Sequence, residues 1–237
     1  MNPTVRSLSV LALLAALAGV GLHEAATADD IDKPIPVAAL DAPKASAPAS
    51  EMAVLAGGCF WGMQGVFEHV RGVTKVVAGY SGGAKATAHY ELVGTEMTGH
   101  AESIQITFDP RVVSFGEILR VYFSVAHDPT ELNRQGPDSG TSYRSEIFFA
   151  SAMQEKIARA YVAQLTAAHT FKDPIVTRIE ALNGFYPAEG YHQDFLIHNP
   201  NYPYIVYNDL PKIAALKRVF PEMYRDKPVM LQVNAGL

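Results

Sequence analysis

The chain has 237 residues, 49% of them hydrophobic and 10% aromatic, which suits one globular domain with a substantial core and some additional length. Its 19 Lys and Arg residues stand against 24 Asp and Glu residues, a net charge of −5, and the sequence has no basic run. Because binding to nucleic acid depends on neutralising phosphates, we expect no nucleic acid among the partners.

The first 28 residues are predicted to form a cleavable signal peptide. Arg6 precedes an uncharged stretch rich in Leu, Ala and Val, residues 7–22, and a small-x-small cleavage site ends at Ala28, before Asp29. The apolar stretch is short for a membrane span, and retention as an uncleaved anchor is the alternative. We therefore expect an exported, periplasmic protein without a stable membrane span.

The composition changes after the predicted cleavage site and again near the C-terminus. Residues 29–50 hold four prolines among Ala, Ser and Asp residues, which predicts a linker and not a core segment. Hydrophobic periodicity then runs over residues 51–225, the predicted folded domain. Residues 226–237 are predicted to be a loosely attached tail, in which the sequence VMLQV could add a short strand.

Strand and helix patterns are mixed within the folded domain. Alternating or short apolar runs predict strands over residues 51–58, 73–83, 102–110, 145–150 and 175–182. Helical spacing of apolar residues predicts helices over 59–70, 114–126, 151–169 and 208–220.

Two of these helices carry recognisable start signals. Ser114 and Glu117 are spaced as a capping box, and Asn208 or Asp209 is the expected cap of the last helix. The links between strands are not all helical crossovers. We therefore predict an α+β fold, a two-layer α/β sandwich whose mixed sheet has helices packed on it, over a doubly wound parallel sheet.

Cys59 is the only cysteine in the chain and lies in the sequence AGGCFWGMQG. It is a buried structural residue, an intermolecular bridge or a reactive thiol, because a single cysteine forms no internal disulfide. It follows Gly57 and Gly58 and opens a predicted helix, where free N–H groups and the helix dipole favour the thiolate. The position indicates an accessible, activated nucleophile, although spacing alone leaves a packed cysteine equally open.

Six sequence blocks around this cysteine, in the family's order, resemble those of the A-type methionine sulfoxide reductases, the peptide-methionine (S)-S-oxide reductases. The blocks are GCFWG, GYSGG, TGHAE, HDPT, RQGPDSGTSYRS and FYPAEGYHQDFL. The resemblance spans about residues 51–203, and it is to the one-cysteine branch, because no further cysteine follows. It implies that residues 51–225 form a catalytic domain that reduces methionine (S)-S-oxide, protein-bound or free, and so repairs oxidised exported proteins.

The resemblance also implies roles for individual residues. Cys59 is the nucleophile that attacks the sulfoxide sulfur and ends as a sulfenic acid. Glu102 is the acid near the oxygen, and we expect burial to raise its pKa above about 4.3. The remaining roles are hydrogen bonds to the sulfoxide oxygen from Tyr90 and Tyr143, ordering of the site by Asp138, and an apolar seat for the methyl group from Phe60 and Trp61.

Each of these residues except Cys59 has an ordinary structural alternative when it is taken singly: a surface glutamate, core aromatics, or an aspartate in a turn. The loop around Tyr90 also departs from the family's pattern, because AKATAHY lacks an expected proline and GTEM precedes TGHAE. His100, His127 and His192 lack metal-ligand spacing, so we expect hydrogen-bonding scaffold residues and no bound metal.

A lone cysteine leaves the second half of the reaction to another molecule. We expect a monomer without a bound cofactor that uses an external thiol: a thioredoxin-like or glutaredoxin-like protein, glutathione, or dithiothreitol in vitro. Two other functions stay open. One is a Cys–His hydrolase or acyltransferase, which needs a histidine within reach of Cys59. The other is a non-catalytic exported binding domain of the same fold.

Overall fold

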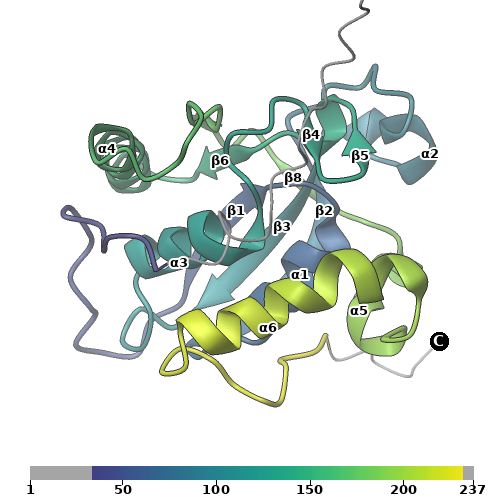
Figure 1. Ribbon diagram of the computed structural model, residues 1–237. Helices are drawn as coiled ribbons and strands as arrows, with labels where there is room; N and C mark the ends of the chain where they lie inside the picture. The colour runs from purple at the N-terminus through teal and green to yellow at the C-terminus, as the bar shows by residue number, and fades with distance from the viewer. Residues whose placement is uncertain (1–33, 232–237) are drawn as a thin grey trace, which may run out of the picture.

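A six-stranded mixed sheet is the centre of the computed structural model, which describes residues 34–231 (Figure 1). The strand order is β7-β6-β1-β3-β2-β8, and only β6 and β7 pair in parallel. A separate two-stranded ribbon pairs β4 with β5. The strands are β1 (Glu51–Ala56), β2 (Val73–Ser81), β3 (Ala101–Phe108), β4 (Arg134–Gln135), β5 (Asp138–Ser139), β6 (Glu146–Phe149), β7 (Arg178–Ala181) and β8 (Phe185–Pro187).

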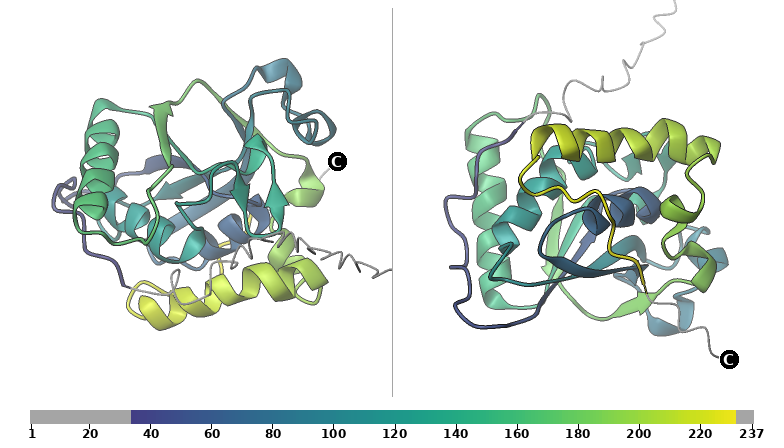
Figure 2. Two further views of the ribbon diagram at one scale, coloured as in Figure 1. Left: turned by 45° about the horizontal axis from the view of Figure 1, so that its top comes forward. Right: turned by 90° about the horizontal axis from the view of Figure 1, so that it is seen from below.

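Helices α1, α3 and α4 pack on one face of this sheet, and α6 packs against α1 (Figures 1 and 2). The helices are α1 (Phe60–Glu68), α2 (Tyr90–Val93), α3 (Phe115–Val121), α4 (Ala152–Ala167), α5 (Phe195–His198) and α6 (Leu210–Val219). The predicted α+β class, with a mixed sheet and helices packed on it, is confirmed. No helix within residues 34–231 has the length and apolar character needed to cross a membrane.

Alternation along the central strands divides the core between the two faces of the sheet. Leu55 of β1 and Ile104 of β3 join the large cluster beneath the helices, while Val54 and Ala56 join a small cluster on the other face. Every residue of α1 except Trp61 is buried, because the sheet, α5 and α6 surround this helix. Its buried residues include two polar ones, Gln64 and Glu68, so the helix is buried on all sides without being apolar throughout.

The predicted helix starts are confirmed in different degrees. Ser114 Oγ accepts a hydrogen bond from Glu117 N, and the Glu117 carboxylate accepts one from Ser114 N, so the capping box is present. Asp209 stands at the N-cap position of α6 but makes no capping hydrogen bond. Its carboxylate instead lies 3.3 Å from Lys212 Nζ. The tail has no strand as far as Leu231, and residues 232–237 lie outside the described residues.

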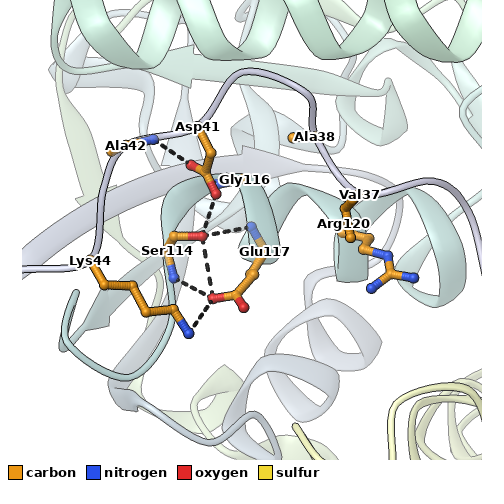
Figure 3. Close-up of a pocket in the computed structure, with 9 residues that line it drawn as sticks. All are labelled: Val37, Ala38, Asp41, Ala42, Lys44, Ser114, Gly116, Glu117 and Arg120. Atoms are coloured by element: carbon orange, nitrogen blue, oxygen red, sulfur yellow. Dashed lines mark hydrogen bonds and ion pairs between the residues drawn. The ribbon is translucent and has the colours of Figure 1, made fainter.

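The predicted linker packs on the domain from residue 34 onward. Residues 34–50, the N-terminal segment, form no helix or strand, as their composition predicts, yet Ile35 is only 3% exposed. Tyr161 Oη of α4 donates a hydrogen bond of 2.6 Å to Pro36 O. Asp41 accepts hydrogen bonds at the start of α3 from Ser114 Oγ and Gly116 N, and Figure 3 shows Asp41 beside Ser114.

The composition did not reveal this docking. A proline-rich segment outside helices and strands has backbone carbonyl groups without backbone partners. Side chains of α3 and α4, far away in sequence, donate hydrogen bonds to these carbonyl groups. The predicted signal peptide, residues 1–28, and the first residues of the predicted linker lie outside the described part of the chain.

Candidate active site

Cys59 stands between the end of β1 and the start of α1, at the N-cap position of the helix. Gly58 makes the turn with φ of +87°, in the left-handed region that favours glycine. A Cβ atom at Gly58 would lie 2.4 Å from Gln135 Cγ, so a larger residue has no space there. The turn therefore depends on glycine both for its backbone conformation and for the close approach of Gln135.

The seven residues expected at the site all line one pocket of about 170 Å³, together with Tyr204. They come from separate parts of the chain: the start of α1, the start of α2, β3, β5 and the 3-10 turn η3 (Thr141–Tyr143). Tyr204 immediately precedes the helical turn η5 (Ile205–Asp209). The residues that share this pocket are Cys59, Phe60, Trp61, Tyr90, Glu102, Asp138, Tyr143 and Tyr204.

Glu102 lies on β3 beside the end of β1, where Ala56 pairs with Ser103. It is 4% exposed, and its carboxyl group accepts a hydrogen bond of 3.0 Å from Phe60 N. Burial raises the pKa of Glu102 to about 8, with a smaller opposing effect from the Phe60 N–H and further increases from nearby carboxylates. As expected, Glu102 is an acid that keeps its proton near neutral pH.

The resting state of Cys59 differs from the expectation. Burial raises the pKa of the Cys59 thiol well above its ordinary value, and the carboxylates of Glu102 and Asp209 raise it further. The Trp61 N–H at the helix start lowers this pKa, as the sequence predicts, but with a smaller effect than burial. The prediction of an accessible thiol favoured as thiolate is therefore wrong, because Cys59 is only 9% exposed and its thiol keeps its proton.

Two phenols line the same pocket as the acid. Burial raises the pKa of Tyr90 to about 12, and burial also raises the pKa of Tyr143. Both hydroxyl groups therefore stay protonated and able to donate at physiological pH. Tyr90 is held through its backbone, because Tyr90 N donates a 3.0 Å hydrogen bond to Glu189, whose other carboxylate oxygen accepts from Tyr80 Oη at 2.8 Å.

Asp138 has a partner that the sequence did not reveal. Tyr204 Oη donates a short hydrogen bond to Asp138 Oδ2. Burial raises the pKa of Asp138, while the Tyr204 hydroxyl and the Lys212 ammonium lower it. The two residues are 66 positions apart, and the aromatic-rich sequence NYPYIVY around Tyr204 was the only local signal for it.

The apolar side of the pocket is held by ring stacking. Trp61 stacks on Phe195 with ring centroids 3.8 Å apart and planes at 12°, and Trp61 Nε1 donates a 3.1 Å hydrogen bond to His192 Nδ1. Phe60 is 1% exposed and lies beside His192, with ring centroids 4.9 Å apart and planes tilted at 56°. Two neighbouring aromatic residues therefore form a fixed apolar wall.

The histidines of the sequence blocks make hydrogen bonds within the protein. His127 Nε2 lies 2.7 Å from Ser145 Oγ, and His100 Nδ1 accepts from Gly83 N at 3.2 Å. Within the described chain no histidine lines the Cys59 pocket. Residues 34–231 contain no group of three or more His, Cys, Asp or Glu residues that could hold a metal ion.

Comparison with known proteins gives consistent matches. The model of the peptide methionine sulfoxide reductase family matches residues 51–224. The chain is 62% identical over 186 residues to peptide methionine sulfoxide reductase MsrA 2 of Mesorhizobium japonicum, covering 78% of this chain and 95% of that protein. It is 49% identical over 194 residues to MsrA 2 of Synechocystis, covering 82% of this chain and 89% of that protein.

Solved structures show the same similarity. Methionine sulfoxide reductase A of Corynebacterium diphtheriae matches with a TM-score of 0.56 and 32% identity, over 76% of this chain and 94% of that one. Reduced Mxr1 of Saccharomyces cerevisiae matches with a TM-score of 0.58 and 32% identity, over 65% and 87%. The family match spans most of the chain and includes every residue of the pocket. The chain therefore belongs to the A-type peptide methionine sulfoxide reductases.

Proposed function

We propose that this methionine sulfoxide reductase acts on the S epimer of methionine sulfoxide, protein-bound or free, through a sulfenic acid on Cys59. The observation that carries the proposal is the shared pocket of one thiol and one protonated carboxyl group. Phe60 N–H donates to Glu102 and belongs to the residue that follows Cys59, so the acid and the nucleophile are held side by side.

The first step needs an acid at the oxygen and a thiolate at the sulfur. Burial raises the pKa of both Cys59 and Glu102, so both groups hold their protons near neutral pH. The thiol gives its proton to solvent only as substrate binds, and Glu102 regains a proton from solvent after the step. The Cys59 thiolate attacks the sulfoxide sulfur while Glu102 gives its proton to the oxygen. The S–O bond breaks, the hydroxyl group passes to Cys59, and methionine leaves.

This step balances in atoms and electrons. One thiol and one sulfoxide become one sulfenic acid and one thioether, so the Cys59 sulfur loses two electrons and the methionine sulfur gains two. The phenols of Tyr90 and Tyr143 donate hydrogen bonds to the oxygen as negative charge develops there. Phe60 and Trp61 form the seat of the methyl group, and Asp138, held by Tyr204, orders the polar side of the pocket.

The second step requires thiols from outside the chain. Cys59 is the only cysteine of the sequence, so a reductant thiol must condense with the sulfenic acid, releasing water and forming a mixed disulfide. A second thiol then releases Cys59 as a thiol. A thioredoxin-like or glutaredoxin-like protein or glutathione fits this role, and dithiothreitol replaces it in vitro. We propose a monomeric, exported, periplasmic enzyme that repairs oxidised exported proteins.

The surroundings of Cys59 favour this reaction over hydrolysis. A Cys–His hydrolase needs an imidazole within hydrogen-bond reach of the sulfur. The residues that line this pocket beside Cys59 are two carboxyl groups, three phenols and two further aromatic rings instead. A non-catalytic binding domain would hold the sulfoxide without converting it, and turnover distinguishes the two.

The test uses the pre-reduced protein and each sulfoxide epimer separately. Without external thiol, we expect the S epimer to yield one equivalent of methionine and a trappable sulfenic acid on Cys59, and dithiothreitol to restore turnover. Cys59→Ser should give neither product. Wild type and Cys59→Ser giving equal results would refute the proposal, and preference for the R epimer would refute the assignment of stereochemistry.

A further inference from the structure

We propose that Glu96 is a positioning residue for this reaction, whose carboxylate clamps the segment that carries Tyr90 to the turn that carries Tyr143. The inference rests on the proposed function, because it concerns the two phenols expected to meet the sulfoxide oxygen. Glu96 does not line the pocket. It belongs to the sequence GTEM, which departs from the family's pattern.

One end of the clamp is the turn η3. Glu96 Oε2 accepts hydrogen bonds from Ser142 N at 2.8 Å and Thr141 Oγ1 at 3.0 Å, and Oε1 accepts one from Ser142 Oγ at 2.6 Å. These two residues immediately precede Tyr143, and Ser142 is 2% exposed. One carboxylate therefore satisfies a backbone N–H and two hydroxyl groups of the turn that places Tyr143.

The other end of the clamp is α2, which begins at Tyr90. Glu96 lies in the turn after this helix, and its N–H donates a 3.0 Å hydrogen bond to Val93 O. A four-residue helix has little stability of its own, so its place depends on the contacts at its two ends. The first end is held by Glu189 at Tyr90 N, and the second by Glu96 on η3.

Glu96 and Gly140, which meet at this contact, both have positive φ angles, and this supports a functional role for the contact. Glu96 has φ of +64°, in the left-handed region that glutamate disfavours. A Cβ atom at Gly140, which precedes η3 with φ of +140°, would lie 2.4 Å from Glu96 Cδ. Unfavourable backbone conformations persist where the surroundings hold them, and they gather at sites of function.

The Glu96 carboxylate also places a negative charge near Glu102. Burial opposes ionisation of Glu96, but hydrogen bonds from Ser142 and Thr141 outweigh it and lower its pKa. The Glu96 carboxylate then helps to raise the pKa of Glu102, where burial has the largest effect. The other titratable groups that act on Glu102 or respond to it are Asp138, Asp209, Cys59, Tyr80, Tyr90 and Tyr143.

Three variants separate the geometry of the clamp from its charge. Glu96→Gln keeps the shape and removes the charge, because the amide oxygen still accepts and the amide N–H donates to Ser142 Oγ. Glu96→Gly removes the clamp and suits the left-handed backbone, which offsets part of the stability lost with the hydrogen bonds. Ser142→Ala weakens the clamp from the other side and keeps the charge. Glu91→Gln, an exposed glutamate on α2, is the matched control.

The readout is the rate at which pre-reduced enzyme releases methionine from the S epimer, without external thiol, at a series of substrate concentrations and pH values. For Glu96→Gly we expect the maximal rate to fall by about 10- to 100-fold with half-saturation changed less than about threefold, because misplaced groups lose rate. For Glu96→Gln we expect a rate near wild type at pH 6. Its loss of activity at high pH should begin at lower pH, because Glu102 loses its proton sooner.

Hydrogen exchange of the backbone gives a second readout that does not depend on substrate. We expect faster exchange over residues 91–97 and 141–144 in Glu96→Gly and Ser142→Ala, and wild-type exchange in Glu91→Gln. If Glu96→Gly released methionine at the wild-type rate and showed wild-type hydrogen exchange, the proposal that Glu96 joins the two segments would be refuted. If the wild type reduces neither epimer, the proposed function fails, while the exchange data still decide whether Glu96 joins the two segments.

Discussion

Replacing Glu102 by glutamine should stabilise the protein while it disables the reaction. Glu102 is buried beside Cys59, and its carboxyl group is a hydrogen-bond acceptor of Phe60 N–H, a contact that a glutamine oxygen can keep. Glutamine has nearly the same shape but never ionises. The substitution therefore removes both the proton that the reaction needs and the cost of a buried charge.

The magnitude follows from the pKa of Glu102, which rises from 4.5 to about 8 on folding. Between these values the unfolded chain has lost the proton and the folded protein has kept it, so stability falls as the pH rises, by about 1.4 kcal/mol for each pH unit. At pH 7 this group lowers the free energy of unfolding by about 3 kcal/mol relative to a neutral side chain. The raised pKa leaves about 90% of Glu102 protonated at pH 7, against about 0.3% for an ordinary glutamate.

Urea unfolding of wild type and Glu102→Gln at pH 5.5 and 7.5 measures this effect. All other titrating groups are common to both proteins, so the stability advantage of the variant should grow by about 2 to 3 kcal/mol between the two pH values. The single-turnover rate should fall by at least about 100-fold. Glu180→Gln, at an exposed position, is the control. A stability difference that does not change with pH would refute the reasoning.

Three further predictions concern the turn, the polar side of the pocket and the N-terminal segment. Gly58→Ala should lose at least about 2 kcal/mol in urea unfolding, because φ of +87° and the nearby Gln135 leave no place for a methyl group, and an unchanged midpoint would contradict this. Tyr204→Phe removes a hydrogen bond to Asp138, so it should raise the pKa of Asp138 and lower the single-turnover rate by about tenfold. The rate is measured over pH 5–8, and an unchanged pH profile would show that Tyr204 has no role in the reaction. Asp41→Ala should lower the free energy of unfolding by about 1 kcal/mol without changing activity, because Asp41 contacts the start of α3 and not the Cys59 pocket. A thermal scan checks the loss of stability, and an activity assay checks that the rate is unchanged.

Local signals in the sequence predicted the elements whose patterns are complete within a short window. The alternation of Ile104, Ile106 and Phe108 predicted β3, and the spacing of Ser114 and Glu117 predicted the start of α3. The three-residue strand β8 and the four-residue helix α2 were missed, because such short elements have no periodicity of their own. Strand order depends on pairings between distant segments and was not predicted.

The site shows the same division between local and distant information. The resemblance of the sequence blocks brought seven pocket residues together, but Tyr204 and Glu96 act through partners far along the chain, which their local sequences do not identify. The ionisation state of Cys59 was predicted in the wrong direction. The helix start is visible in the sequence, whereas the burial that outweighs it comes from segments that meet only in the folded protein.

The hydrogen bond from Phe60 N–H to Glu102 has a consequence for repeated turnover. One planar peptide unit joins this N–H to Cys59, so a displacement of α1 moves the sulfur and the hydrogen-bond donor together. In the proposed reaction Glu102 gives up its proton, and the same N–H then faces a carboxylate; charge-assisted hydrogen bonds are roughly twice as strong as neutral ones. The Phe60 N–H therefore holds the Glu102 carboxylate more strongly than it holds the protonated acid. This hydrogen bond keeps Glu102 beside Cys59 until the carboxylate is protonated again, which favours the same pocket geometry in each cycle.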